Sequence, residues 1–215
     1  RANRHLRGVE IDHKVSIVEA VTERVGHRAD VAFDCHWTFS GGSAKRLAEA
    51  LEPYDVWWLE DPVPPENHDV QREVTQSTST PIGVGENVYR KHGQRRLIEN
   101  QAVDIIAPDM PKVGGMRETR KIADLADMYY IPVAMHNVAS PIATMGSVHV
   151  GAAIPNSLAV EYHSYELGWW EDLVEEDLIE DGYIEVPEKP GLGVTLDMDA
   201  VEEHMVDGET LFDEA

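Results

Sequence analysis

The sequence contains a single cysteine, Cys35, among its 215 residues. An intrachain disulfide, or a zinc site built on several cysteines, is therefore excluded. No run of 18 apolar residues and no signal peptide is present, so we expect no membrane association. Arg1 is not an initiator methionine, and we expect further sequence upstream of it.

Basic residues are also scarce, since 18 Lys and Arg accompany 40 Asp and Glu, for a formal net charge of −22. Such a charge argues against nucleic acids and anionic membranes as partners, because both are negative. Hydrophobic residues make up 42% of the chain, which is too many for a disordered acidic segment.

Lysine is the rarer of the two basic residue types, with 6 Lys against 12 Arg. A folded, acidic and lysine-poor chain is typical of a cytoplasm rich in salt, where repulsion between carboxylates is screened within about 3 Å at molar salt. We therefore expect a cytoplasmic protein adapted to salt. An ordinary acidic enzyme is the alternative.

Short apolar runs alternate with helix-like stretches along most of the chain. The runs are VAFDCH (31–36), VWWLED (56–61), IGVGEN (82–87), DIIAPD (104–109), IPVAMH (131–136) and LAVEYH (158–163). A helix-like stretch follows each run except the last, and another precedes residue 31. This alternation predicts parallel strands joined by right-handed crossovers.

Each apolar run ends on or near a residue that can do chemistry. These residues are Asp34, Glu60, Glu86, Asp109, His136 and Glu161, and they recur every 23 to 27 residues. A near-constant βα unit, with no G-x-G-x-x-G after a strand, favours a barrel over a doubly wound sheet. We predict an α/β fold in which six strands of an eight-stranded (β/α) barrel are visible, with the active site at the strand C-termini.

Asp34, Glu60 and Glu86 end three consecutive strands, which are neighbours in a barrel. Three carboxylates in one mouth repel one another unless a cation neutralises them. Oxygen ligands suit Mg²⁺ better than zinc, so we predict a magnesium site. The alternative is that each carboxylate caps the following helix or pairs with a surface arginine.

Two histidines accompany this predicted metal site. His36 lies two residues after Asp34, so on a strand both side chains face the same mouth. His136 ends the strand next to Asp109, and a carboxylate on a neighbouring strand can fix the tautomer of an imidazole and raise its basicity. The other histidines considered are assigned to packing (His149 and His163) or to the surface (His92 and His204).

A metal with a histidine base suggests removal of the proton next to a carboxylate, since the divalent ion can stabilise the charge that develops there. With His36 as an acid opposite the base, a hydroxyl on the next carbon can leave as water. The predicted chemistry is therefore a β-elimination.

The chain resembles the mandelate racemase branch of the enolase superfamily. The matching stretches are FDCHWTFS, WWLEDPVPPEN, PIGVGENVY, DIIAPDMPKVGGMRE, IPVAMHNVASPIA, AVEY and DGYIEVPEKPGLG, which span essentially the whole chain. The resemblance implies a modified (β/α)7β barrel with Mg²⁺ on Asp34, Glu60 and Glu86. It also implies an Asp109–His136 dyad as general base, and Glu161 as a hydrogen-bonding group near the substrate carboxylate.

The Asp-x-His form of the first motif is similar to that of galactonate and gluconate-type dehydratases. It implies that His36 protonates the departing 3-hydroxyl of a small-molecule sugar acid (galactonate, gluconate or xylonate), giving a 2-keto-3-deoxy acid. The alternatives are a racemase or epimerase of a 2-hydroxy acid, which typically has Asn in place of His36, and a non-catalytic barrel.

The family also has an N-terminal capping domain and two earlier barrel strands, one of which can carry a Lys-x-Lys base. Neither part is in this chain. We expect residues 1–30 to form a lead-in segment and barrel helix, residues 31–163 six βα units, and residues 164–215 an acidic segment that packs on the barrel or capping domain. We also expect a homo-oligomer.

Overall fold

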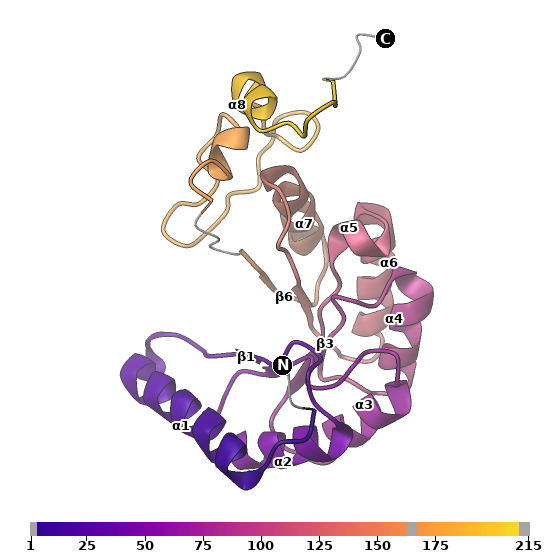
Figure 1. Ribbon diagram of the computed structural model, residues 1–215. Coiled ribbons are helices and arrows are strands. Elements are labelled where there is room, and N and C mark those ends of the chain that lie inside the picture. The colour runs from indigo at the N-terminus through magenta and orange to yellow at the C-terminus, as the bar shows by residue number, and fades with distance from the viewer. Residues whose placement is uncertain (1–3, 163–166, 211–215) are drawn as a thin grey trace.

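The computed structural model describes residues 4–162 and 167–210 of the chain. Its centre is a six-stranded parallel sheet in which each strand pairs with the next one along the sequence (Figure 1). The strands are β1 (Phe33–Asp34), β2 (Leu59–Glu60), β3 (Ile82–Val84), β4 (Ile105–Ile106), β5 (Val133–Met135) and β6 (Ser157–Val160). Sequential strand order is that of a βα barrel and not of a doubly wound sheet, whose order reverses.

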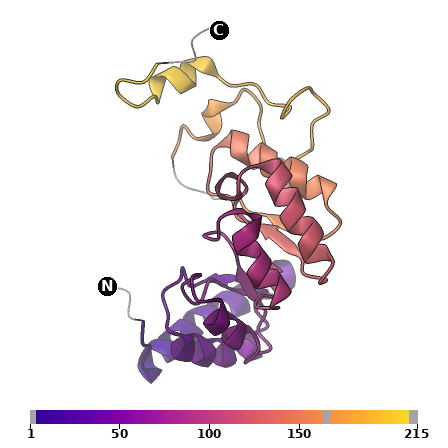
Figure 2. The ribbon, with the colours of Figure 1, turned by 90° about the vertical axis from the view of Figure 1, so that its right-hand side faces the viewer.

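Helices follow the strands and cover the outer side of the sheet (Figures 1 and 2). In chain order they are α1 (Gly8–Val25), α2 (Gly41–Leu51), α3 (His68–Thr75), α4 (Arg90–Glu99), α5 (Met110–Val113), α6 (Met116–Asp127) and α7 (Pro141–Ala153). Single 3-10 turns are η1 (Gly26–Arg28), η2 (Glu52–Tyr54) and η3 (Glu171–Leu173). The predicted strand–helix alternation is confirmed, although the strands are shorter than the apolar runs.

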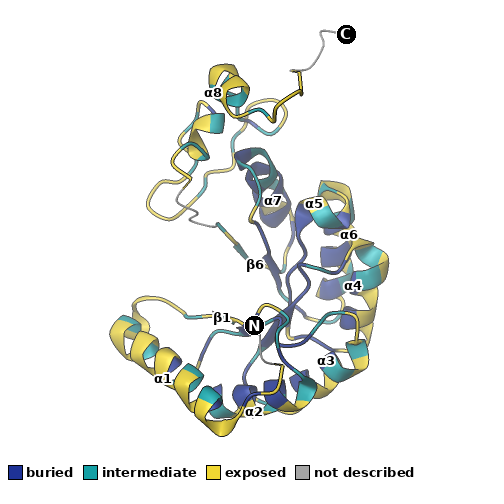
Figure 3. Ribbon diagram, viewed as in Figure 1, coloured by how far each residue is buried: buried dark blue, intermediate teal, exposed yellow. Residues whose placement is uncertain are grey.

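The core lies between the sheet and the helices that cover it. Figure 3 shows the helices dark blue on the side that faces the strands and yellow on the outer side. Fully buried side chains from both layers include Leu47, Leu59, Ile82, Leu97, Ile106 and Ile122. Burying one such side chain contributes about 1.5–3 kcal/mol, so this layer holds the strand ends in place.

Both edges of the sheet are open. The inner strands β3 and β5 are buried along their whole length, whereas the residues of the edge strands β1 and β6 are exposed or half-buried. In Figure 1 the sheet curves from β1 to β6 as an open arc. The described fold is therefore a parallel half-barrel, which fits part of the predicted barrel.

The acidic segment after β6 packs beside α7 (Figure 1). It contains η3, an isolated antiparallel bridge between Val174 and Leu196, and a short helix α8 (Met198–Glu203). His149 Nε2 of α7 lies 3.0 Å from the carbonyl oxygen of Leu192. Among the residues that the structure describes, no helix is long and apolar enough to cross a membrane.

Candidate active site

The parallel sheet brings the six predicted site residues to one end. Asp34 and Glu60 are the last residues of β1 and β2 and are direct register partners. The others follow the ends of their strands within three residues: Glu86 after β3, Asp109 after β4, His136 after β5 and Glu161 after β6. Because every strand points the same way, all six residues share the carboxyl edge of the half-barrel.

Three carboxylates converge at this edge. One oxygen each from Glu60, Asp61 and Glu86 lies within 4.8 Å of the others. Burial, together with the neighbouring negative charges, raises the pKa of Glu60 to about 7 and that of Asp61 to about 8. Asp61 is 1% exposed, and its Oδ1 has no hydrogen-bond partner within the described part of the chain. Converging, poorly compensated oxygen donors of this kind fit a hard divalent cation such as Mg²⁺.

The membership of this carboxylate group differs from the sequence-based expectation. The structure places Asp34 beside the group, with its Oδ1 accepting a 2.7 Å hydrogen bond from the backbone N–H of His36. Asp61 was missed because neighbouring residues on a strand face opposite sides. In the structure β2 ends at Glu60, and Asp61 has a left-handed backbone (φ 40°) that brings its carboxylate close to those of Glu60 and Glu86.

The predicted Asp109–His136 pair is formed. His136 Nδ1 lies 2.8 Å from Asp109 Oδ2, and both side chains are buried. Asp109 is itself held, since its Oδ1 caps α5 by accepting from the backbone N–H of Lys112 at 2.9 Å. On the other side of the ring, Nε2 lies 2.8 Å from Glu86 Oε2, so each ring nitrogen donates to a carboxylate in this structure.

The electrostatics of this pair follow from its neighbours. Burial alone would lower the pKa of His136, but its hydrogen bonds to Asp109 and Glu86 raise it to about 10. Burial would raise the pKa of Asp109, but the hydrogen bonds from His136 and the Lys112 backbone lower it. Asp109 is thus held as a carboxylate, which is the state that can orient an imidazole.

Several supporting residues were not predicted from the sequence. Lys112 Nζ lies 3.6 Å from Asp109 Oδ2, and Asn87 Nδ2 donates to Glu86 Oε1 at 3.0 Å. The backbone N–H of Asn137 donates to Glu161 Oε2 at 2.8 Å, which places that carboxylate 3.8 Å from His136 Nε2. Asn87 and Asn137 follow a strand end by three and two positions and Lys112 by six, and nothing in their spacing distinguishes them from ordinary loop residues.

His36 reaches the predicted place by a different route. The argument from strand periodicity was wrong, because β1 ends at Asp34 and His36 has a left-handed backbone (φ 51°). Its imidazole Nδ1 nevertheless lies 3.5 Å from Asp34 Oδ2, with the side chain 66% exposed. The ring is therefore at the carboxyl edge and accessible.

A cavity of about 300 Å³ borders three of these groups, Glu60, His136 and Glu161. The rest of its lining is apolar: Ala32, Trp57, Trp58, Ala107, Ala134, Met135 and Ala159. A cavity with a few convergent polar groups is suited to a small polar molecule.

Three of the other predicted histidines lie in the described part of the chain, away from this site. His149 is half-buried against Leu192, and His92 and His204 are exposed, as predicted. His204 stacks on Trp169 with ring centroids 4.1 Å apart. His163 lies outside the described residues.

Fold and site together define a class of protein: part of a βα barrel with a buried histidine–aspartate pair beside converging carboxylates. The model of the Enolase C-terminal domain-like family matches residues 3–200, and the chain belongs to this family. The resemblance to the mandelate racemase branch is thereby confirmed.

Individual relatives narrow the comparison. The chain is 82% identical to a D-xylonate dehydratase of Haloferax volcanii over 215 residues, which are all of this chain and 52% of that protein. It is 34% identical to the D-galactonate dehydratase family member RspA of Halomonas elongata over 189 residues, or 87% of this chain and 47% of that one. The chain spans about half the length of these relatives.

A solved structure supports the same family assignment. The mandelate racemase/muconate lactonizing enzyme-like protein of Rubrobacter xylanophilus superposes with a TM-score of 0.93 at 44% identity. The superposition covers 98% of this chain and 54% of that one. The half-barrel therefore matches just over half of a longer protein.

Proposed function

We propose that this chain is the catalytic part of a Mg²⁺-dependent sugar-acid dehydratase that acts on an aldonate such as D-xylonate. It removes the C2 proton and the 3-hydroxyl and gives a 2-keto-3-deoxy acid. The observation that carries the proposal is the His136–Asp109 pair, 2.8 Å apart, beside the converging carboxylates of Glu60 and Glu86. The likeness to the D-xylonate and D-galactonate dehydratases supports this choice of substrate class.

In this proposal His136 is the general base. His136 lines the cavity, and with Glu86 engaged by a cation its Nε2 would be released from that carboxylate and able to take the C2 proton, while Asp109 holds the Nδ1 proton and stabilises the imidazolium that forms. Burial of both residues keeps competing water away from this proton transfer.

Asp34, Glu60 and Glu86 are the proposed ligands of Mg²⁺, with Asp61 beside them. When bound, the ion supplies positive charge that stabilises the substrate carboxylate as negative charge develops on it. Trp58 Nε1 donates to Glu60 Oε2 at 2.7 Å and so fixes one carboxylate oxygen, leaving the other oxygen for a cation.

His36 is the proposed general acid. As the electrons of the C2–H bond form the new double bond, the C3–O bond breaks and His36 protonates the departing hydroxyl, which leaves as water. Glu161, fixed by the Asn137 backbone, is placed to hydrogen-bond near the substrate carboxylate. The resulting enol converts to the 2-keto acid.

The wider assembly belongs to the same proposal. Two further strands and an N-terminal capping domain complete the half-barrel as a (β/α)7β barrel. Residues 1–30 form the lead-in segment, 31–163 the six βα units and 164–215 the acidic segment that packs on the barrel or capping domain. The complete protein is cytoplasmic and forms a homo-oligomer.

The test uses the full chain as the organism makes it, supplied with Mg²⁺ and D-xylonate, D-gluconate or D-galactonate in separate reactions. We expect a 2-keto acid from at least one aldonate, measured by a carbonyl reagent. Absence of a keto acid from every aldonate, together with deuterium incorporation at C2 of a 2-hydroxy acid, would instead establish a racemase or epimerase. The likeness to the mandelate racemase-like structure is the reason for considering this alternative.

A further inference from the structure

The turn that carries His36 has an uncommon backbone. His36 and Trp37 are consecutive residues with left-handed conformations (φ 51° and 54°), which side-chain-bearing residues seldom adopt. Such conformations persist only where the surroundings hold them, and they occur often at functional sites. The contacts of this turn should therefore show what holds His36.

Asp61 makes two hydrogen bonds to this turn. Its carbonyl oxygen accepts from the backbone N–H of Trp37 at 2.7 Å, and its Oδ2 accepts from the indole Nε1 of Trp37 at 2.8 Å. Asp61 is also tied to the centre of the sheet, because its own N–H donates to the carbonyl of Gly83 in β3 at 2.9 Å. Asp61 is therefore buried and anchored to β3, and it fixes both the backbone and the side chain of Trp37.

Trp37 in turn contacts the imidazole of His36. The two ring centroids are 3.7 Å apart with an interplanar angle of 39°. On its other side, His36 has only the 3.5 Å approach of its Nδ1 to Asp34 among the ion pairs of the described residues, and its side chain is 66% exposed. Among the described residues, the indole is therefore the main surface against which the exposed imidazole packs.

We propose that Asp61 and Trp37 form a clamp that positions His36 for protonation of the leaving hydroxyl. Both are positioning residues, and the inference rests on the proposed function, in which His36 is the general acid. Displacing an acid by about 1 Å can cost roughly a hundredfold in rate, so fixing the indole has a direct kinetic effect. The competing role for Asp61 is that of a cation ligand through its free Oδ1.

Four variants of the full chain test the clamp: Trp37→Phe, Asp61→Ala, their double variant, and Asp61→Asn. Phe keeps an aromatic ring against His36 but loses the N–H donor, whereas Asn keeps an oxygen that can accept from the indole. At saturating Mg²⁺ and aldonate, dehydration is measured as keto acid and base function as deuterium exchange at C2. Mg²⁺ affinity is measured by calorimetry without substrate.

We expect Trp37→Phe to slow dehydration about tenfold to a hundredfold while C2 exchange stays within about twofold, and Asp61→Ala to slow dehydration at least as much. The double variant should be no slower than the slower single one, because both remove the same contact. Asp61→Asn should restore most of the dehydration rate, and Trp37→Phe should leave Mg²⁺ affinity unchanged. Trp169→Phe, which alters the ring that stacks on His204, is the matched control and should change neither rate.

Three results would overturn the clamp: unaltered dehydration in Trp37→Phe, equal loss of dehydration and exchange in that variant, or loss of both rates and of Mg²⁺ binding in Asp61→Asn. The last would make Asp61 a cation ligand. The ratio of the two rates does not depend on the folded fraction, so partial unfolding cannot imitate the expected result. Failure of the proposed function is recognised separately, by a wild-type chain that yields no keto acid.

Discussion

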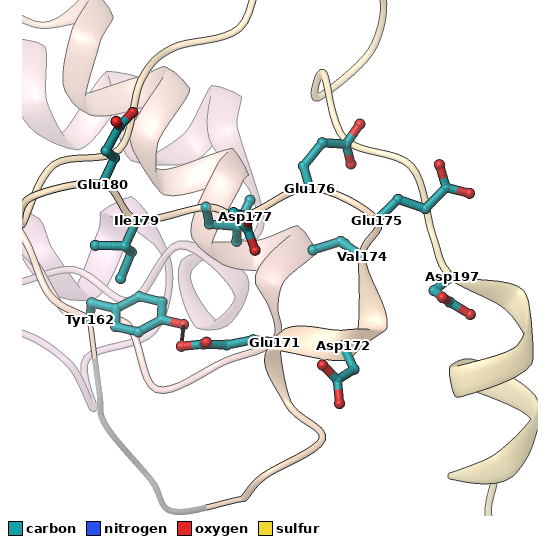
Figure 4. Close-up of a pocket in the computed structure, with 11 residues that line it drawn as sticks. Tyr162, Glu171, Asp172, Val174, Glu175, Glu176, Asp177, Ile179, Glu180 and Asp197 are labelled. Carbon is teal, nitrogen blue, oxygen red and sulfur yellow. Dashed lines mark hydrogen bonds between the residues drawn. The ribbon is translucent and has the colours of Figure 1, made fainter.

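Two regions of the molecule gather carboxylates around a cavity, and they differ in almost everything else. The carboxyl edge of the half-barrel surrounds about 300 Å³, whereas the segment after β6 lines a larger cavity of about 760 Å³ (Figure 4). The second cavity is lined by more acidic residues: Glu171, Asp172, Glu175, Glu176, Asp177, Glu180 and Asp197.

Burial and convergence separate the two regions. In Figure 4 the carboxylates of Glu175, Glu176 and Glu180 point away from the Tyr162–Glu171 hydrogen bond and do not meet at one place. Hydrogen bonds from the Thr195 backbone and Lys189 hold the pKa of Glu176 below its usual range. At the barrel edge, burial instead raises the pKa of Glu60 and Asp61. The size of a cavity and its number of acids are therefore poor guides to a site, whereas buried and converging carboxylates are good ones.

The largest difference in reaction rate is expected when a histidine of each region is replaced in turn. We expect His136→Asn to lower both C2 exchange and dehydration by about 10⁴-fold, at the upper end of what general base catalysis contributes. The control is His204→Asn, an exposed histidine of the acidic segment, which should leave both rates within about twofold. Substantial C2 exchange in His136→Asn would place the base elsewhere.

The proposed acid should show a smaller and selective effect. We expect His36→Asn to slow dehydration about 10²–10³-fold and to leave C2 exchange largely intact, since only departure of the hydroxyl needs the acid. Exchange is followed by NMR in D₂O and dehydration as keto acid. His92→Asn, at an exposed helical site, is the control, and parallel loss of both rates in His36→Asn would contradict the division of roles.

The two acidic clusters should also differ in cation binding. We expect Glu86→Gln to weaken Mg²⁺ binding about tenfold to a hundredfold, because it removes one charge from a buried group. Glu176→Gln removes one charge from the exposed cluster and should leave the affinity unchanged. Calorimetry at fixed ionic strength makes the comparison, and equal effects of the two changes would remove the distinction between the clusters.

Salt should produce the smallest difference. With a net charge of −22, lowering the salt concentration lengthens the range of repulsion and destabilises the folded chain. We expect the free energy of unfolding to fall by about 1 kcal/mol between molar and 0.5 M salt, or the thermal midpoint to fall by roughly 2–4 °C. Stability that does not depend on salt would favour an ordinary acidic enzyme.

Hydrogen exchange should show residues 167–210 opening before the half-barrel, since the largest fully buried side chains all lie in the half-barrel.

The half-barrel was largely predictable because its signal repeats. Six apolar runs at nearly constant spacing can be satisfied by only a few architectures, and the relative from Haloferax volcanii agrees with the salt-adapted interpretation of the composition. The Asp109–His136 pair was predictable for the same reason, since neighbouring parallel strands bring their C-terminal residues together.

The conformation of the turns after β1 and β2 was not predictable in this way. Asp61, His36 and Trp37 have left-handed backbones that no periodicity encodes, and they follow strands that end earlier than the apolar runs do. Their positions depend on hydrogen bonds between segments 24 residues apart, such as that from Trp37 to Asp61.

The sequence by itself determined the order of strands and helices, the acidic surface and the residue types at the strand ends, because these follow from periodicity and composition. Only the tertiary structure decided which carboxylates meet. In the structure the chain turns at Asp61, where a continued strand would point the side chain to the opposite face, and its carboxylate joins those of Glu60 and Glu86. The indole of Trp37 lies between Asp61 and His36. The reason is that side-chain convergence depends on backbone angles after the strand ends, where contacts across the sheet outweigh local preference.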